Sequence, residues 1–63
     1  MYLVRRKINT VYAPCVYCNS FKDALDISDK AFKDGFADII VEPYTSGGKI
    51  DIYVDGKKVY KQK

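Results

Sequence analysis

One helix signature, over residues 21–34, constrains this 63-residue chain more than any other feature. Ser20 is a favoured N-cap residue, and Asp23, three positions later, can act as its capping-box partner and complement the helix dipole. Gly35 suits the left-handed position that follows a helix. A 100° wheel gathers a single buried arc from Phe21, Ala24, Leu25, Ser28, Ala31 and Phe32. The segment is therefore predicted to be an amphipathic helix with one face directed at a core.

Strand patterns lie on both sides of this helix. They cover residues 2–8, 11–12, 37–42, 49–54 and 57–61. Residues 49–54 alternate in polarity, as a half-buried strand does, and Asp55-Gly56 is the signal of a type I′ hairpin turn. The segment from Pro14 to Asn19 is predicted to be a loop, because the proline stops the short strand before it.

The predicted architecture is a single α+β domain over residues 1–63. A small antiparallel sheet of three to five strands has one helix packed on one face, in the order strand, short strand, helix and three strands. Alternation turns four apolar residues of the last hairpin toward the helix, namely Ile50, Ile52, Val54 and Val59. Since one helix covers only one face of such a sheet, the other face is predicted to be solvated. That face would present Tyr53, Tyr60, Lys49, Lys58, Leu3, Arg5 and Lys7.

Composition limits the chemistry that this chain can perform. Histidine is absent, which removes the commonest general base and the commonest metal ligand. The longest apolar run, residues 39–41, is too short for a membrane span, and no charged-then-apolar leader begins the sequence. Two cysteines are fewer than a secreted disulfide framework uses. We therefore predict a cytoplasmic, non-enzymatic domain with no cofactor, no metal and no membrane contact.

Cys15 and Cys18 form a Cys-x-x-Cys pair. Residues 11–18, Val-Tyr-Ala-Pro-Cys-Val-Tyr-Cys, resemble the strand and Cys-Pro-Tyr-Cys segment of glutaredoxins, and residues 52–57 resemble their later strand and turn. The resemblance implies thiol–disulfide exchange, with Cys15 as the nucleophile and Cys18 as the resolving thiol. Val16 stands where that family has its motif proline. Two other interpretations stay open: a four-thiolate zinc site shared by a symmetric dimer, and reduced cysteines that only pack a loop.

Charge is unevenly distributed along the chain. Residues 1–20 carry three basic and no acidic side chains, residues 21–42 carry three lysines against six acids, and residues 43–63 carry five lysines against two aspartates. An acidic helix and a basic sheet follow, and each supplies a candidate binding face. The candidate sheet face consists of Tyr53, Tyr60, Lys58, Lys49, Arg5 and Lys7. The candidate helix face consists of Asp23, Asp26, Asp29 and Asp34.

Tyrosines with adjacent cations are typical of protein interfaces and also of sheets that bind nucleic acid. We predict a small binding protein whose partner is another protein, in the style of phage- or mobile-element-encoded inhibitors of host proteins. Two alternatives are a nucleic-acid-binding module that uses the basic, tyrosine-bearing sheet and a glutaredoxin-like thiol protein. A homodimer is compatible with each of them.

Overall fold

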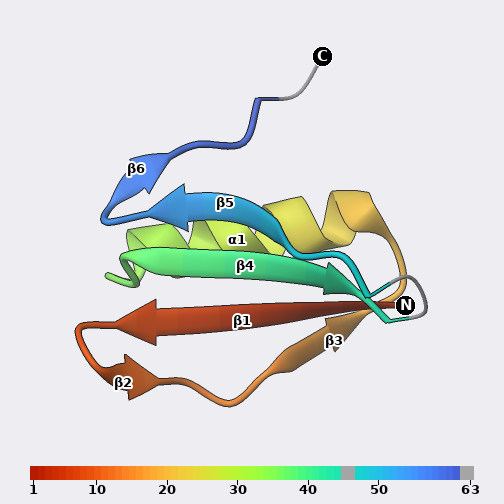
Figure 1. Cartoon of the computed structure of the whole chain (residues 1–63), viewed down its shortest axis with the longest axis horizontal. Coiled ribbons are helices and arrows are strands. Elements are labelled where there is room, and N and C mark those ends of the chain that lie inside the picture. Colours follow the sequence, from red (N-terminus) through yellow and green to blue (C-terminus); the bar gives the residue numbers. More distant parts are fainter. Residues whose placement is uncertain (45–46, 62–63) are drawn as a thin grey trace.

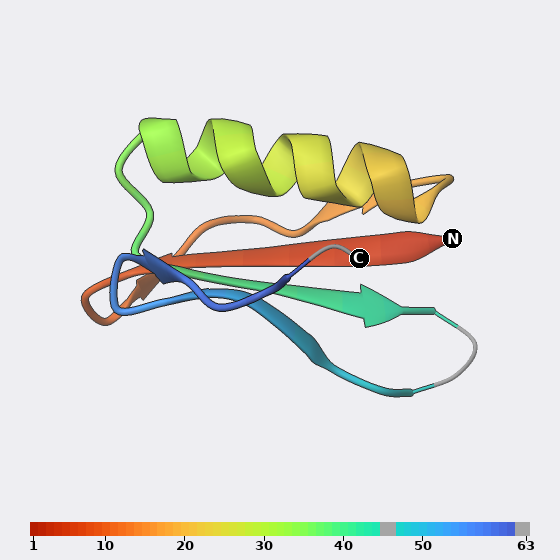
Figure 2. The ribbon, with the colours of Figure 1, turned by 90° about the horizontal axis from the view of Figure 1, so that it is seen from above.

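The computed structural model describes residues 1–44 and 47–61. Its elements are β1 (Tyr2–Ile8), β2 (Val11–Tyr12), β3 (Val16–Cys18), α1 (Phe21–Lys33), β4 (Asp38–Pro43), β5 (Ile50–Val54) and β6 (Lys57–Lys58). Within these residues the chain forms two layers, a six-stranded antiparallel sheet and one helix that lies across one of its faces (Figures 1 and 2). The predicted α+β class is confirmed.

The sheet is built around β1 and β4, which pair along the whole length of β1 up to Lys7. The strand order is β2-β1-β4-β5-β6. β3 pairs with the first half of β1 and β2 with its last two residues, so that β2 and β3 line the same edge of β1 (Figure 1). The sheet has six strands because β3 lies in the segment that the sequence predicted to be a loop. That prediction is wrong for residues 16–18, since Pro14 interrupts the edge but Val16 and Cys18 still pair with Val4 and Tyr2.

The helix has the ends that its sequence predicts. The Ser20 hydroxyl accepts a hydrogen bond from the backbone N–H of Asp23 at 3.1 Å. At the other end Gly35 has φ +110°, and the N–H of Phe36 donates to the Ala31 carbonyl at 3.2 Å. This six-to-one bond across a left-handed glycine is a Schellman ending, and it satisfies a carbonyl that the helix leaves without an internal partner.

Small side chains bring the helix close to the sheet. Ala24, Ser28 and Ala31 are its buried residues, and the Ser28 hydroxyl donates to the Ala24 carbonyl at 2.8 Å, so its burial leaves no free polar group. The sheet contributes four fully buried side chains, Val4, Ile39, Val41 and Ile52. Phe32, predicted to be core, is instead 39 % exposed at the rim of the helix.

A β-bulge in β5 reverses the side of the sheet on which the residues after it lie. Tyr53 lies opposite Ile39 and Asp51 lies opposite Ile40, so that Ile52 is one residue extra on this strand. Ile52 and Tyr53 are consecutive in sequence, yet both are buried. Because side chains alternate strictly along a regular strand, an extra residue reverses every position after it. Tyr53 therefore turns toward the helix and Val54 turns away from it, the opposite of the prediction.

The final hairpin continues this reversal. Asp55 and Gly56 have φ +52° and +79°, which confirms the predicted type I′ turn. Lys58 pairs with Tyr53, as predicted, but the pair lies on the helix side of the sheet. Val59, predicted to be buried, is 47 % exposed.

Candidate functional site

The candidate site is the outer face, which we define as the side of the sheet directed away from α1. Strand alternation on either side of the buried residues Val4, Ile39 and Val41, together with the bulge in β5, determines which residues belong to it. Leu3 lies between Tyr17 and Glu42, and Lys7 lies between Tyr12 and Asp38. The outer face consists of Leu3, Arg5, Lys7, Tyr12, Tyr17, Asp38, Ile40, Glu42, Asp51, Val54 and Lys57, the last of which pairs with Val54 across the hairpin.

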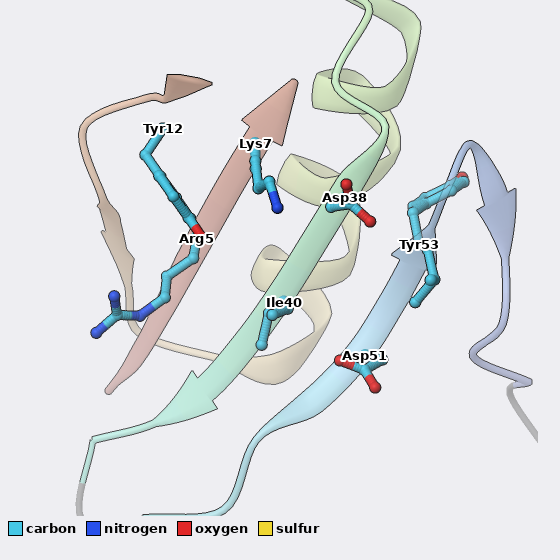
Figure 3. A pocket seen from close by; sticks show the side chains of 8 residues that line it. Arg5, Lys7, Tyr12, Asp38, Ile40, Asp51 and Tyr53 are labelled. Atoms are coloured by element: carbon cyan, nitrogen blue, oxygen red, sulfur yellow. The ribbon is translucent and has the colours of Figure 1, made fainter. Parts of the chain in front are cut away.

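A shallow hollow of about 310 Å³ occupies much of this face. Figure 3 shows its side chains rising from the strands, with Arg5 and Lys7 on β1, Asp38 and Ile40 on β4 and Asp51 on β5. The full lining is Arg5, Lys7, Tyr12, Asp38, Ile40, Asp51, Tyr53 and Val54, and Tyr53 only borders the hollow, because its ring packs on Phe32 on the helix side of the sheet. An apolar floor with charged walls is the usual make-up of a surface that recognises another molecule.

The electrostatics of the outer face are mixed rather than basic. The Arg5 Nε lies 2.7 Å from the Glu42 Oε1, so the two side chains form a close ion pair. The Arg5 N–H is not aligned for a regular hydrogen bond to this oxygen. Asp38 accepts a hydrogen bond from the backbone N–H of Asp55 at 3.1 Å. The Lys7 ammonium lies 5.5 Å from the centre of the Tyr12 ring, within the range of a cation–π contact.

Tyr53 and Lys58, both predicted for the exposed face, join the sheet to the helix instead. The Tyr53 ring stacks on Phe32 at 4.4 Å, and its hydroxyl donates to Asp29 Oδ1 at 2.9 Å. Lys58 Nζ lies 3.3 Å from the same oxygen. The hydrogen bond from Tyr53 lowers the pKa of Asp29; partial burial opposes this effect, and the hydrogen bond and charge of Lys58 add to it. Burial and then the Asp29 carboxylate raise the pKa of Tyr53.

Tyr60 is also placed against the helix, contrary to its predicted position. Its ring packs edge-on to Phe21 at 5.5 Å, and Phe21 in turn lies 5.6 Å from the Tyr2 ring. Lys49 is exposed in the segment before β5. Of the predicted sheet residues, Arg5 and Lys7 are therefore the ones that the outer face brings together.

The predicted acidic helix face is only partly acidic. Asp23, Asp26 and Asp34 are exposed, and Asp29 is held by the contact with Tyr53. Lysines share the exposed surface of the helix with them, at Lys22, Lys30 and Lys33. Alternating charges of both signs are typical of a solvated helix surface.

The cysteine pair spans a strand rather than the start of a helix. Cys15 is exposed, whereas Cys18 is half-buried in β3, its thiol 3.7 Å from the Tyr2 carbonyl. Three residues of extended chain separate their Cα atoms by roughly 10 Å, beyond the 4.4–6.8 Å that a disulfide spans. Burial, followed by the charge of Asp23, raises the pKa of the Cys18 thiol, which disfavours the reactive thiolate.

Two aromatic residues of the outer face, Tyr12 and Tyr17, were not among the site residues predicted from the sequence. Tyr12 and Tyr17 are 67 % and 61 % exposed, and they stand on the edge strands beside β1. The sequence carries no direct signal for this, because residues five positions apart point to opposite faces of a continuous strand. The break at residues 13–15 between β2 and β3 brings both tyrosines to the same face.

Over residues 1–44 and 47–61 no group of three or more Cys, Asp or Glu side chains lies close enough to hold a metal ion. In the same part of the chain, no helix is both long and apolar enough to cross a lipid bilayer. No protein-family model, curated protein or solved structure matches this chain. Its function is therefore inferred from the geometry of the outer face alone.

Proposed function

We propose that this chain is a non-enzymatic binding module that contacts a protein partner through its outer face. One observation carries the proposal: the helix covers one side of the sheet (Figure 2), and the other side holds a hollow lined by the exposed Tyr12 (Figure 3), with the exposed Tyr17 on the same face beside Leu3. A sheet with one uncovered face normally presents polar side chains to water. Here that face also carries the apolar side chains of Leu3, Ile40 and Val54.

The side chains of this face suit a protein partner. Tyrosine and arginine are enriched at protein interfaces, where a ring covers a large area at a small cost in conformational entropy. Tyr12 and Arg5 both line the hollow, and Tyr17 stands beside Leu3. Ile40, near the middle of the face, has Arg5 on one side and Asp51 on the other, and an apolar residue with charged neighbours resembles the anchor and rim of a protein interface.

The two alternative faces have less support. A nucleic-acid-binding sheet needs an excess of cations, but Arg5 and Lys7 share the outer face with carboxylates at Asp38, Glu42 and Asp51. On the helix, lysines interrupt the aspartates that would imitate a phosphate backbone. A thiol–disulfide activity would require β3 to unpair before Cys15 could reach Cys18.

Capture from an extract of the native host tests the proposal, with the bound proteins quantified by mass spectrometry. The double variant Tyr12→Ala with Tyr17→Ala should bind the captured partner at least tenfold more weakly, because truncating an aromatic anchor typically costs about 2 kcal/mol. Its circular dichroism and melting should stay near wild type, since both rings are exposed.

The matched control changes the helix instead. Asp23→Lys with Asp26→Lys should leave capture within a few-fold of wild type. If this variant loses the partner and the tyrosine variant retains it, the acidic helix face is the binding surface and the proposal fails. A partner that proves to be nucleic acid, with affinity falling linearly on a log–log plot against salt, would also contradict it.

A further inference from the structure

The chain along the edge of β1 contains one residue more than β1 can pair with. Lys7 lies opposite Tyr12, and Val4 lies opposite Val16. Between these two pairs β1 advances by three residues, whereas the edge chain advances by four. One residue of the segment 13–15 is therefore extra, as in a β-bulge, and the chain there bows away from β1 (Figure 1). We call this segment the edge bulge.

The edge bulge determines the face on which Tyr17 lies. Tyr17 is paired with Leu3, a residue of the outer face. Regular pairing continued from Tyr12 would instead place Tyr17 opposite Tyr2, whose ring packs on Phe21 of the helix. A shift of one residue moves every side chain of a strand to the other face. The edge bulge is therefore the reason that Tyr12 and Tyr17, five positions apart, lie on the same side of the sheet.

The core favours the same register. Val16 and Cys18, on either side of Tyr17, pack against the buried cluster on the helix side. A regular edge would turn both of them outward and Tyr17 inward. However, β3 has only three residues with which to resist this shift. Even one contact at the edge bulge therefore changes the balance between the two registers.

Arg6 makes that contact from the helix side of β1. Its Nη2 donates a hydrogen bond to the Pro14 carbonyl at 2.9 Å, and its Nε is buried. Its guanidinium carbon lies 5.0 Å from the centre of the Phe36 ring, which is a cation–π contact. The backbone carbonyl of Arg6 also accepts the N–H of Ala13 at 3.0 Å. Arg6 therefore holds the first two residues of the edge bulge, one with its backbone and one with its side chain.

Pro14 suits this place in the sheet. Proline has no N–H to contribute to a ladder, and within sheets it is found at edges and bulges. A bulge leaves backbone groups without ladder partners, and Arg6 supplies one for the Pro14 carbonyl. Resting on the proposed function, we infer that Arg6 is a positioning residue: it holds the edge bulge, which sets the register of β3 and keeps Tyr17 beside Tyr12 on the binding face.

Amide hydrogen exchange, followed by NMR, tests this inference without a partner. Arg6→Met removes the guanidinium but keeps an apolar stem against Phe36. The amides of β3 should then exchange about tenfold faster, the effect of losing one hydrogen bond to a charged group. Lys30→Met, on the exposed surface of the helix, is the matched control and should leave exchange in β3 unchanged.

Deletion of Pro14 separates positioning from general stability. Without residue 14 the edge pairs regularly with β1, and Tyr12 stays opposite Lys7 while Tyr17 stays opposite Leu3. Since neither the bulge nor its hydrogen bond exists in this background, adding Arg6→Met should hardly change exchange in β3. A continuous edge strand can pair with another copy, so the comparison is made at low protein concentration. Equal acceleration in both backgrounds would show that Arg6 only stabilises the fold, and the inference would be wrong.

The register can also be measured in the unmodified chain, which does not depend on the folding of any variant. Nuclear Overhauser contacts are expected between the side chains of Tyr17 and Leu3 and between those of Val16 and Val4. Contacts of Tyr17 with Tyr2 in their place would overturn the inference. Exchange in β3 that is the same in Arg6→Met as in wild type would also overturn it.

This inference and the proposed function fail in different ways. If Arg6→Met releases β3 but still binds the partner captured from the host as tightly as wild type, Arg6 positions Tyr17 and the proposed binding surface is wrong. If β3 exchanges at its normal rate in Arg6→Met while Tyr12→Ala with Tyr17→Ala loses the partner, the binding surface stands and only the positioning role is excluded.

Discussion

Ile39 and Ile40 are neighbours on β4, yet they belong to surfaces of opposite character. Ile39 is fully buried with Val4 and Val41 beneath the small side chains of the helix. Ile40 is half-buried among charged residues on the outer face. The fully buried side chains of the sheet lie on the helix side, whereas the outer face keeps contact with water. The comparison indicates that stability is concentrated on one face and that the other is available for recognition.

The largest expected effect comes from exchanging these two isoleucines for alanine. Ile39→Ala should lower the free energy of unfolding by about 3 kcal/mol, because it removes fully buried volume from a small core. Ile40→Ala should cost about 1 kcal/mol or less, since its side chain already contacts water. Urea unfolding of both variants at low protein concentration measures the difference, and equal losses would show that the outer face is itself part of the core.

The helix covers the inner face, which is the side of the sheet directed toward α1, and its position there depends on how the helix ends. Gly35 has φ +110° and no atom within 4 Å of the place where a Cβ would stand, so only backbone strain opposes a side chain there. Gly35→Ala should therefore cost about 1 kcal/mol. Gly48→Ala is the matched control, because Gly48 is equally open without a positive φ, and thermal melting should show little change. A melting temperature unchanged in Gly35→Ala would mean that the helix ends differently.

The sequence predicted these local features well, and the reason is physical. A cap and a type I′ turn are decided by a few adjacent residues, so Ser20, Gly35 and Asp55-Gly56 each carry the full signal. The strand at residues 2–8 was predicted with its observed bounds for the same reason, since its pattern is local.

The faces of the last hairpin could not be predicted in this way. By polarity residues 50–54 fit a regular strand, with Ile50, Ile52 and Val54 on one face, and nothing in that pattern indicates a bulge. The choice depends on contacts with a helix more than twenty residues earlier, where Phe32 stacks on Tyr53 and Asp29 accepts its hydroxyl. A single extra residue then moved Tyr53, Lys58 and Tyr60 out of the candidate site, while Arg5 and Lys7, on a strand without a bulge, stayed in it.

The contact that stabilises the bulge should be visible in the pH dependence of stability. Because the pKa of Asp29 is lowered on folding, its contribution is present above the ordinary value of about 3.9 and is lost as the pH falls through the lowered one. The pKa of Tyr53 is raised, so its contribution is present below about 10 and is lost as the pH rises through the raised value.

Each effect should be smaller than 1 kcal/mol, since the Asp29 side chain is 46 % exposed. Asp29→Asn should flatten the acidic limb of a plot of unfolding free energy against pH, and Tyr53→Phe should flatten the alkaline limb. Tyr12→Phe, on the outer face, is the control and should leave both limbs unchanged. If Tyr12→Phe altered the alkaline limb as much as Tyr53→Phe, the assignment of Tyr53 to the inner face would be wrong.

The smallest effects are expected at the two cysteines, which differ in burial. Cys18 packs against the core and its pKa is raised by burial, whereas Cys15 is exposed. Cys15→Ser should change the free energy of unfolding by less than about 0.5 kcal/mol, and Cys18→Ser should cost somewhat more, because a hydroxyl replaces a partly buried thiol. Alkylation by iodoacetamide, followed by mass spectrometry, should modify Cys15 first, since the thiolate is the form that reacts. Faster modification of Cys18, or a disulfide between the two in the folded chain, would require β3 to leave the sheet and would restore the thiol–disulfide interpretation.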